Sequence, residues 1–121
     1  MGDEVRTDEI EARLPLKSAW FHILLALGDG RMHGYAIRAD VEARTEGRVV
    51  LWPATLYGSL RAMTAEGLIE EVDPEVCADD DPRRRYYALT ALGKRLLAAE
   101  TRRLEALVAA ARATRALGDA G

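Results

Sequence analysis

Cysteine, histidine and long apolar runs are scarce in this chain. Cys77 is the only cysteine among 121 residues, which excludes an internal disulfide and a cysteine-rich zinc site. The two histidines, His22 and His33, stand far apart without paired carboxylates, so no metal site is expected. The longest apolar run, residues 19–27, is shorter than the roughly 20 residues that span a membrane. No basic and apolar signal sequence opens the chain, so we expect a cytoplasmic protein without membrane contact.

The sequence also lacks the residue patterns that are typical of enzyme active sites. The sequence contains no nucleophile paired with a base, no glycine-rich phosphate loop and no metal-ligand spacing. We therefore expect neither an enzyme nor a cofactor. Cys77 has two interpretations, an incidental small residue or a redox-sensitive thiol, and its acidic neighbours favour the first because they disfavour the reactive thiolate.

Net positive charge is lacking as well. The formal net charge is −3, whereas a DNA-binding domain is typically basic. The charges are unevenly placed, because seven acids lie between Glu70 and Asp81, and nine basic residues oppose two acids between Arg83 and Arg115. Electrostatic interactions decay over a Debye length of about 10 Å, so the local field decides binding. A modest DNA binder remains compatible with this composition.

A short helix with clear signals at both ends is expected between Trp52 and Gly67. Pro53 suits its first turn, and Gly67 suits the left-handed residue just after its end. The residues with helical spacing on the apolar face are Leu56, Leu60 and Met63. The opposite face is small and nearly free of acid, and it comprises Ala54, Thr55, Tyr57, Gly58, Arg61 and Ala65. Such a face allows close approach to a partner, and the DNA major groove admits one α-helix.

A β-hairpin is expected directly after this helix. Two β-prone runs, residues 68–73 and 83–90, flank a polar loop bounded by prolines. The second run begins with Arg83, Arg84 and Arg85, which suit contact with phosphate. A helix followed by a hairpin with a basic tip is the order of a winged helix-turn-helix, in which the helix contacts bases and the wing contacts the backbone.

Further elements are expected on both sides of this unit. Helices are predicted at residues 17–27 and 33–44, where His33 caps or turns the chain and Tyr35 is among the inward-facing candidates. Residues 49–51 are expected to add a short strand beside the hairpin.

The C-terminal region predicts one long helix. Residues from Ala91 to about Leu117 are mostly good helix formers, and Thr90 suits the N-cap. A helix of about 27 residues would be about 40 Å long, which exceeds what this domain can cover. A two-fold homodimer is the commonest way to cover the remaining apolar stripe. The candidate dimerisation residues are Leu96, Leu97, Leu104, Leu107, Val108 and Ala111.

Four segments in register resemble the PadR family of bacterial transcriptional regulators. They are His33–Ile37, Pro53–Leu60, Gly67–Ile69 and Arg84–Gly93. The resemblance implies a dimeric winged-helix DNA-binding protein, usually a repressor, of the short subfamily with a single C-terminal dimerisation helix. It also implies a small aromatic effector at the dimer interface, where Trp20 is the candidate contact; the alternative is that Trp20 simply fills the core.

We therefore expect a mainly α fold with a small β-hairpin, built as a winged helix-turn-helix followed by a long C-terminal dimerisation helix. Residues 1–13 would form an N-terminal arm or short helix, 14–90 the DNA-binding domain, and 91–117 the dimerisation helix. The expected function is a sequence-specific transcriptional repressor that binds a pseudo-palindromic operator in double-stranded DNA as a homodimer. The alternative, which the net acidity favours, is a winged-helix protein-interaction module that does not bind DNA.

The candidate DNA-binding residues share the outer face of the 52–67 helix, the wing or the preceding helix. They are Tyr35, Thr55, Tyr57, Gly58, Arg61, Arg83, Arg84 and Arg85. Simpler interpretations exist for each kind of residue. A tyrosine can lie at the edge of the core, a threonine can bond the helix backbone, and arginines can protect a strand edge.

Overall fold

The structure is a computed structural model that describes residues 6–73 and 84–118. The predicted contact of Arg83, the redox question at Cys77 and the loop between the two hairpin strands lie outside the described residues. No helix of the described segments is long and apolar enough to cross a membrane.

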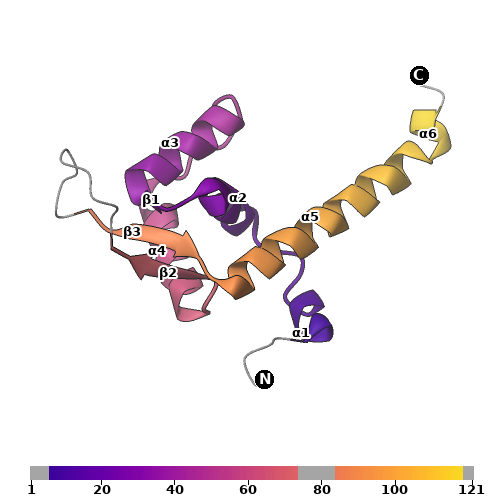
Figure 1. Ribbon diagram of the computed structural model, residues 1–121. Helices are drawn as coiled ribbons and strands as arrows, with labels where there is room; N and C mark the ends of the chain where they lie inside the picture. The colour runs from indigo at the N-terminus through magenta and orange to yellow at the C-terminus, as the bar shows by residue number, and fades with distance from the viewer. Residues whose placement is uncertain (1–5, 74–83, 119–121) are drawn as a thin grey trace.

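Three helices packed beside a small sheet form the body, and a long helix runs out of it (Figure 1). The elements in chain order are α1 (Thr7–Glu11), α2 (Ser18–Ala26), η1 (Leu27–Asp29), β1 (Met32–His33), α3 (Gly34–Arg44), α4 (Pro53–Ala65), β2 (Ile69–Val72), β3 (Tyr86–Leu89), α5 (Ala91–Arg112) and α6 (Arg115–Gly118). This arrangement confirms the predicted α+β winged-helix fold, with α4 in the position of the recognition helix.

The sheet is antiparallel with the strand order β1-β3-β2. The predicted hairpin is confirmed, with Ile69 opposite Leu89 across β2 and β3. The predicted strand at residues 49–51 is wrong, because the third strand is β1, which pairs with the other edge of β3. The Val49 N–H donates instead to the Thr45 hydroxyl at 3.0 Å, so it does not join a strand ladder. A two-residue strand such as β1 has no alternation that the sequence could reveal.

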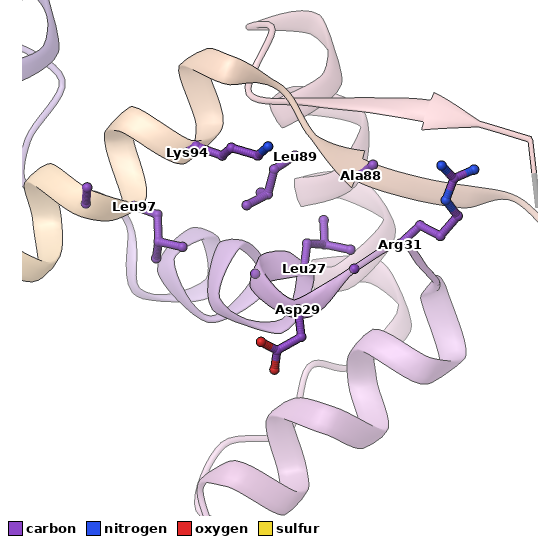
Figure 2. Close-up of a pocket in the computed structure, with 10 residues that line it drawn as sticks. Leu27, Asp29, Arg31, Ala88, Leu89, Lys94 and Leu97 are labelled. Atoms are coloured by element: carbon purple, nitrogen blue, oxygen red, sulfur yellow. The ribbon is translucent and has the colours of Figure 1, made fainter.

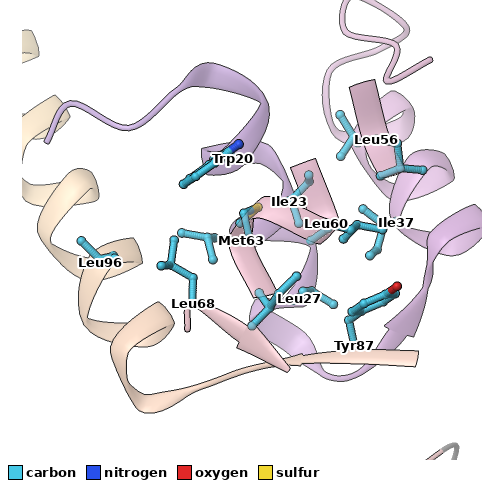
Figure 3. Packing of buried hydrophobic residues seen from close by; sticks show 14 of the residues in the cluster. Trp20, Ile23, Leu27, Ile37, Leu56, Leu60, Met63, Leu68, Tyr87 and Leu96 are labelled. Carbon is cyan, nitrogen blue, oxygen red and sulfur yellow. The ribbon is translucent and has the colours of Figure 1, made fainter. Parts of the chain in front are cut away.

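The core lies between α2, α3, α4, the first half of α5 and the sheet (Figure 3). Leu56, Leu60 and Met63 are all buried, as the helical spacing predicts. Pro53 occupies the first turn of α4, and Gly67 follows its end with a φ of 82°. These features fix which face of α4 points outward.

Helix α3 begins at a capping histidine. The Ala36 N–H donates to Nδ1 of His33 at 3.1 Å, which confirms the predicted cap. The prediction that Tyr35 faces inward is wrong, because 70% of its surface is exposed. Ile37 and Val41 are buried and define the inner face, and Tyr35 lies about 200° around the helix from Ile37.

Helix α5 is joined tightly to the end of α4. The Thr90 hydroxyl accepts the Gly93 N–H at 3.0 Å, which confirms the predicted N-cap, and it donates to the Gly67 carbonyl at 2.6 Å. The helix ends at Arg112, so the prediction of one helix to about Leu117 is wrong. The Thr114 hydroxyl donates to the Ala111 carbonyl at 2.7 Å, a local bond that competes with continuation of the helix.

A buried carboxylate ties α5 to the chain segment before α2. Glu100 is 2% exposed, and it accepts hydrogen bonds from Nε of Arg103 at 2.6 Å and from the Leu16 N–H at 3.2 Å. The Arg103 guanidinium lowers the pKa of Glu100 below its ordinary value of 4.5, against the opposing effect of burial.

This depressed pKa predicts an acid-sensitive contribution to stability. The contribution is present above pH 4.5, the ordinary carboxyl pKa, and is lost as the pH falls through the lower pKa of the folded state. Glu100→Gln should cost about 1–3 kcal/mol at neutral pH and less under acid conditions. Thermal melts across a pH series of wild type and Glu100→Gln measure this, with exposed Glu105→Gln as the control. Parallel curves for wild type and Glu100→Gln would contradict the assignment.

Candidate nucleic-acid interface

A groove separates the outer side of α4 from the hairpin and the start of α3. Its volume is about 690 Å³. Its lining residues are His33, Gly34, Tyr35, Tyr57, Leu60, Arg61, Thr64, Ala65, Glu71, Arg84, Arg85 and Tyr87. Five of the predicted DNA-binding residues therefore meet in one place, although they come from three separate elements.

Tyr57 occupies its position because Gly34 leaves room for it. A Cβ atom at Gly34 would lie 3.0 Å from the Tyr57 hydroxyl, closer than ordinary van der Waals contact. About half of Tyr57 is nevertheless exposed, at 51%. The hydroxyl end of the ring therefore rests on the first turn of α3, and Tyr57 lines the groove as a half-exposed residue and not as a buried core residue.

The wing arginines are held by partners on neighbouring strands. Nη1 of Arg84 lies 3.1 Å from Nε2 of His33, and Nη1 of Arg85 lies 4.0 Å from a carboxylate oxygen of Glu71. Arg61 completes the set from α4. The groove lining thus carries three arginines against one glutamate, so it is locally basic although the chain is acidic.

Tyr87 of β3 is a further tyrosine at the groove, and it is mostly buried. Burial raises the pKa of Tyr87 above its ordinary value of 10, and the charge of Glu71 raises it further. Tyr87 also lines the groove, a position that the sequence did not predict.

Thr55 and Gly58 lie outside the groove lining. Thr55 is exposed in the first turn of α4, and Gly58 is half-buried with open space where a Cβ would stand. Both belong to the outer face of α4 that the sequence predicts. Thr55 and Gly58 would contact DNA only if the outer face of α4 lies inside a groove of the duplex.

The predicted dimerisation residues divide along α5. Leu96 is fully buried in the core of its own chain, so its assignment to the dimer interface is wrong. Leu97 packs against the same core and also lines a pocket of about 580 Å³ beside η1 (Figure 2). Leu107 and Val108 are 54% and 52% exposed, on the part of α5 that projects beyond the body.

The other predicted dimerisation residues also lie on the projecting part of α5. Leu104 is half-buried and Ala111 is exposed. The apolar surface available to a partner is therefore the distal half of α5, and its proximal half belongs to the core.

Trp20 belongs mainly to the core. It is 9% exposed, and Nζ of Lys17 lies 5.1 Å from its ring centroid. The pocket beside it has a volume of about 230 Å³, below the roughly 300 Å³ at which drug-sized ligand sites begin. An effector at Trp20 would need a second chain to enlarge this pocket.

Among the residues that the structure describes, no group of three or more His, Cys, Asp or Glu side chains could hold a metal ion.

Residues 23–99, which include α3, α4 and the hairpin around the groove, match the profile of the transcriptional regulator PadR-like family. The chain belongs to the PadR-like family. Proteins of this family are transcriptional regulators and not enzymes, and the winged helix of this chain agrees with its membership. The match ends at residue 99, before the exposed part of α5 begins.

One curated relative and several solved structures resemble this PadR-like chain. An uncharacterised 37.1 kDa protein in a transposon of Streptomyces fradiae is 37% identical over 78 residues, which are 64% of this chain and 20% of that protein. The chain thus spans about a fifth of the length of this relative.

Solved structures support the same fold. A transcriptional regulator from Clostridium thermocellum is 22% identical with a TM-score of 0.66, and the match covers 90% of this chain and 96% of that one. Bacillus subtilis PadR in complex with operator DNA is 24% identical with a TM-score of 0.58 and coverage of 70% and 47%. At these identities the likeness shows the winged-helix fold alone.

Proposed function

We propose that this PadR-like protein represses transcription by binding a pseudo-palindromic operator as a homodimer in the cytoplasm. The observation that carries the proposal is the basic groove in which Arg61, Arg84 and Arg85 meet beside the small outer face of α4. In a winged helix-turn-helix the recognition helix enters the major groove and neighbouring elements contact the backbone. Bacillus subtilis PadR, which shares this fold, was solved on its operator.

The outer face of α4 suits entry into a DNA groove. Its exposed residues from Ala54 to Arg61 are small, hydroxyl-bearing or basic, and none is acidic. Thr55 and Tyr57 can donate hydrogen bonds, and Arg61 can contact guanine in the manner of many DNA-binding arginines. The wing residues Arg84 and Arg85 lie across the groove from α4, where the phosphate backbone would pass.

The exposed apolar part of α5 supports a two-fold dimer. The apolar side chains of Leu107 and Val108 need cover, and a second copy of the same helix supplies it in the commonest oligomer geometry. Two recognition helices would then occupy successive major grooves about 34 Å apart. A small aromatic effector would bind in the pocket beside Trp20, which Leu96 of proximal α5 also lines, and its binding there would release the operator.

Salt dependence separates DNA binding from the alternative of a protein-interaction module. DNA binding through several phosphates weakens with ionic strength, with a logarithmic slope of roughly −0.9 per phosphate. Fluorescence anisotropy of a labelled duplex across a salt series measures this slope. A steep negative slope supports the proposal, and the absence of saturable binding at low salt would favour the interaction module that the net charge of −3 permits.

Helix and wing should contribute differently to affinity. Arg61→Ala should cost roughly 1–3 kcal/mol on the preferred operator and relax preference at one position, because it removes a base contact. Arg84→Ala should weaken all duplexes alike and reduce the salt slope by about one, because it removes a phosphate contact. Binding to operator and scrambled duplexes measures both effects, with Arg6→Ala on the distant N-terminal side as the control. The reverse pattern would make the wing the specificity element.

A further inference from the structure

An exposed tryptophan stands at the start of α4, outside the groove already described. Trp52 is the N-cap residue of α4, and 63% of its surface is exposed. Tryptophan is rarely left open to water, because its ring is the largest apolar side chain. Among the described residues, the other large apolar side chains that are exposed are Tyr35 and Tyr57 beside the groove and Leu107, Val108 and Leu117 near the C-terminal end, and only Tyr35 is more exposed than Trp52.

The position of Trp52 is fixed by its neighbours in the chain. Leu51 is buried at 3% exposure, and Pro53 restricts Trp52 to an extended backbone, with φ −65° and ψ 153°. Its carbonyl accepts the Leu56 N–H at 2.9 Å, the first hydrogen bond of α4. The indole therefore projects from a rigid junction, and its exposure does not reflect a loosely held loop.

An arginine of α3 lies over the indole ring. The guanidinium carbon of Arg38 is 5.3 Å from the ring centroid, within the range of a cation–π contact. Nε of Arg38 donates to Oε1 of Glu42 at 3.2 Å, which orients the side chain. Within the described residues the hydrogen bond of Arg38 goes to Glu42 through Nε, so its other guanidinium N–H groups can donate to a further acceptor, and so can the N–H of the exposed Trp52 ring.

This surface continues the candidate nucleic-acid interface along α3. Tyr35 and Arg38 are three residues apart on that helix and therefore lie on one side of it. Tyr35 lines the groove beside Tyr57, and Arg38 lies against Trp52 at the start of α4. The exposed rings of Tyr57, Tyr35 and Trp52 therefore all belong to α3 or to α4 and its N-cap, and Trp52 is the one outside the groove.

We propose that Trp52 and Arg38 form a contact for the sugar–phosphate backbone of DNA at the edge of the site that α4 occupies. This proposal rests on the proposed function. The indole face suits the apolar side of a deoxyribose, and the indole N–H and the guanidinium suit phosphate oxygens. In helix-turn-helix proteins the helix before the recognition helix crosses the backbone, and α3 and the α3–α4 junction occupy that place. The contact positions α4 and carries no sequence information.

The two tryptophans allow a direct test by fluorescence. Trp20→Phe leaves Trp52 as the only tryptophan, and Trp52→Phe leaves only the buried Trp20. Acrylamide quenching is measured with and without a mixed-sequence duplex long enough for two half-sites, while anisotropy of the labelled duplex reports binding. DNA should lower the quenching of Trp52 toward that of Trp20 and leave Trp20 unchanged.

Affinity measurements supply a second readout that does not depend on Trp20→Phe folding well. Trp52→Ala should weaken binding roughly tenfold on operator and scrambled duplexes alike. Arg38→Gln should reduce the salt slope by about one, whereas Arg6→Ala should not. In wild type the DNA-induced fluorescence change should be present, and in Trp52→Phe it should be lost.

The outcomes separate the two proposals. Binding by anisotropy with unchanged quenching of Trp52 and wild-type affinity of Trp52→Ala would overturn the backbone contact and leave DNA binding intact. Absence of binding by wild type to any duplex would overturn the proposed function, and the contact with it.

Discussion

Replacement of Gly93 by alanine is expected to destabilise the protein by about 3 kcal/mol or more and to lower its melting temperature on the order of 10 °C. Gly93 lies in the first turn of α5 with its Cα against the Leu68 carbonyl. A Cβ at this position would overlap that backbone oxygen. The backbone here is fixed by Thr90, whose N–H donates to the same carbonyl at 3.1 Å, so neither side can yield cheaply.

Gly58→Ala is the matched control for this substitution. Gly58 is also a helical glycine, but nothing lies within 4 Å of its Cβ position. Alanine should therefore stabilise α4 by roughly 0.5–1 kcal/mol, since it reduces the entropy of the unfolded chain. Differential scanning calorimetry of both variants measures the contrast. Equal melting temperatures for Gly93→Ala and wild type would contradict the tight junction between α4 and α5.

Charging the exposed face of distal α5 is expected to abolish the dimer and most of the operator affinity. Leu104→Glu together with Leu107→Glu places two carboxylates on the proposed interface, where their desolvation opposes association. Light scattering should then report a mass of 13.3 kDa, against twice that value for wild type. Operator binding should weaken at least about a hundredfold, because the second half-site is no longer bound within one molecule.

A matched control variant tests whether the position of the new charges, and not only their number, disrupts the dimer. Ala106→Glu together with Ala109→Glu adds the same charge on the opposite side of α5, where both residues are exposed. This variant should remain dimeric and bind operator normally. If Leu104→Glu with Leu107→Glu stays dimeric, distal α5 is not the interface.

The fold was predictable wherever a local signal matched the tertiary structure. Pro53, Gly67 and the spacing of Leu56 and Leu60 determined α4, and the polar loop between two β-prone runs determined the hairpin. The two-residue strand β1 was not predictable, because its pairing with β3 depends only on contacts distant in sequence.

The prediction that Leu96, at the proximal end of the apolar stripe of α5, is a dimerisation residue was wrong for a similar reason. Helical periodicity places Leu96 and Leu107 on the same apolar stripe of α5. It does not show that Leu96 is buried in the core of its own chain while Leu107 is exposed. Their difference depends on how far the body extends along the helix. The groove residues were found from the wing and the outer face of α4, whereas the Trp52–Arg38 contact joins two helices and had no sequence signal.

Selection of bound duplexes from a random pool measures whether α4 and the hairpin together recognise specific DNA. We expect enrichment of two inverted half-sites centred about one helical turn apart, and loss of preference at one position of each half-site for Arg61→Ala. A pool that stays random after repeated selection with folded, dimeric protein would contradict this expectation.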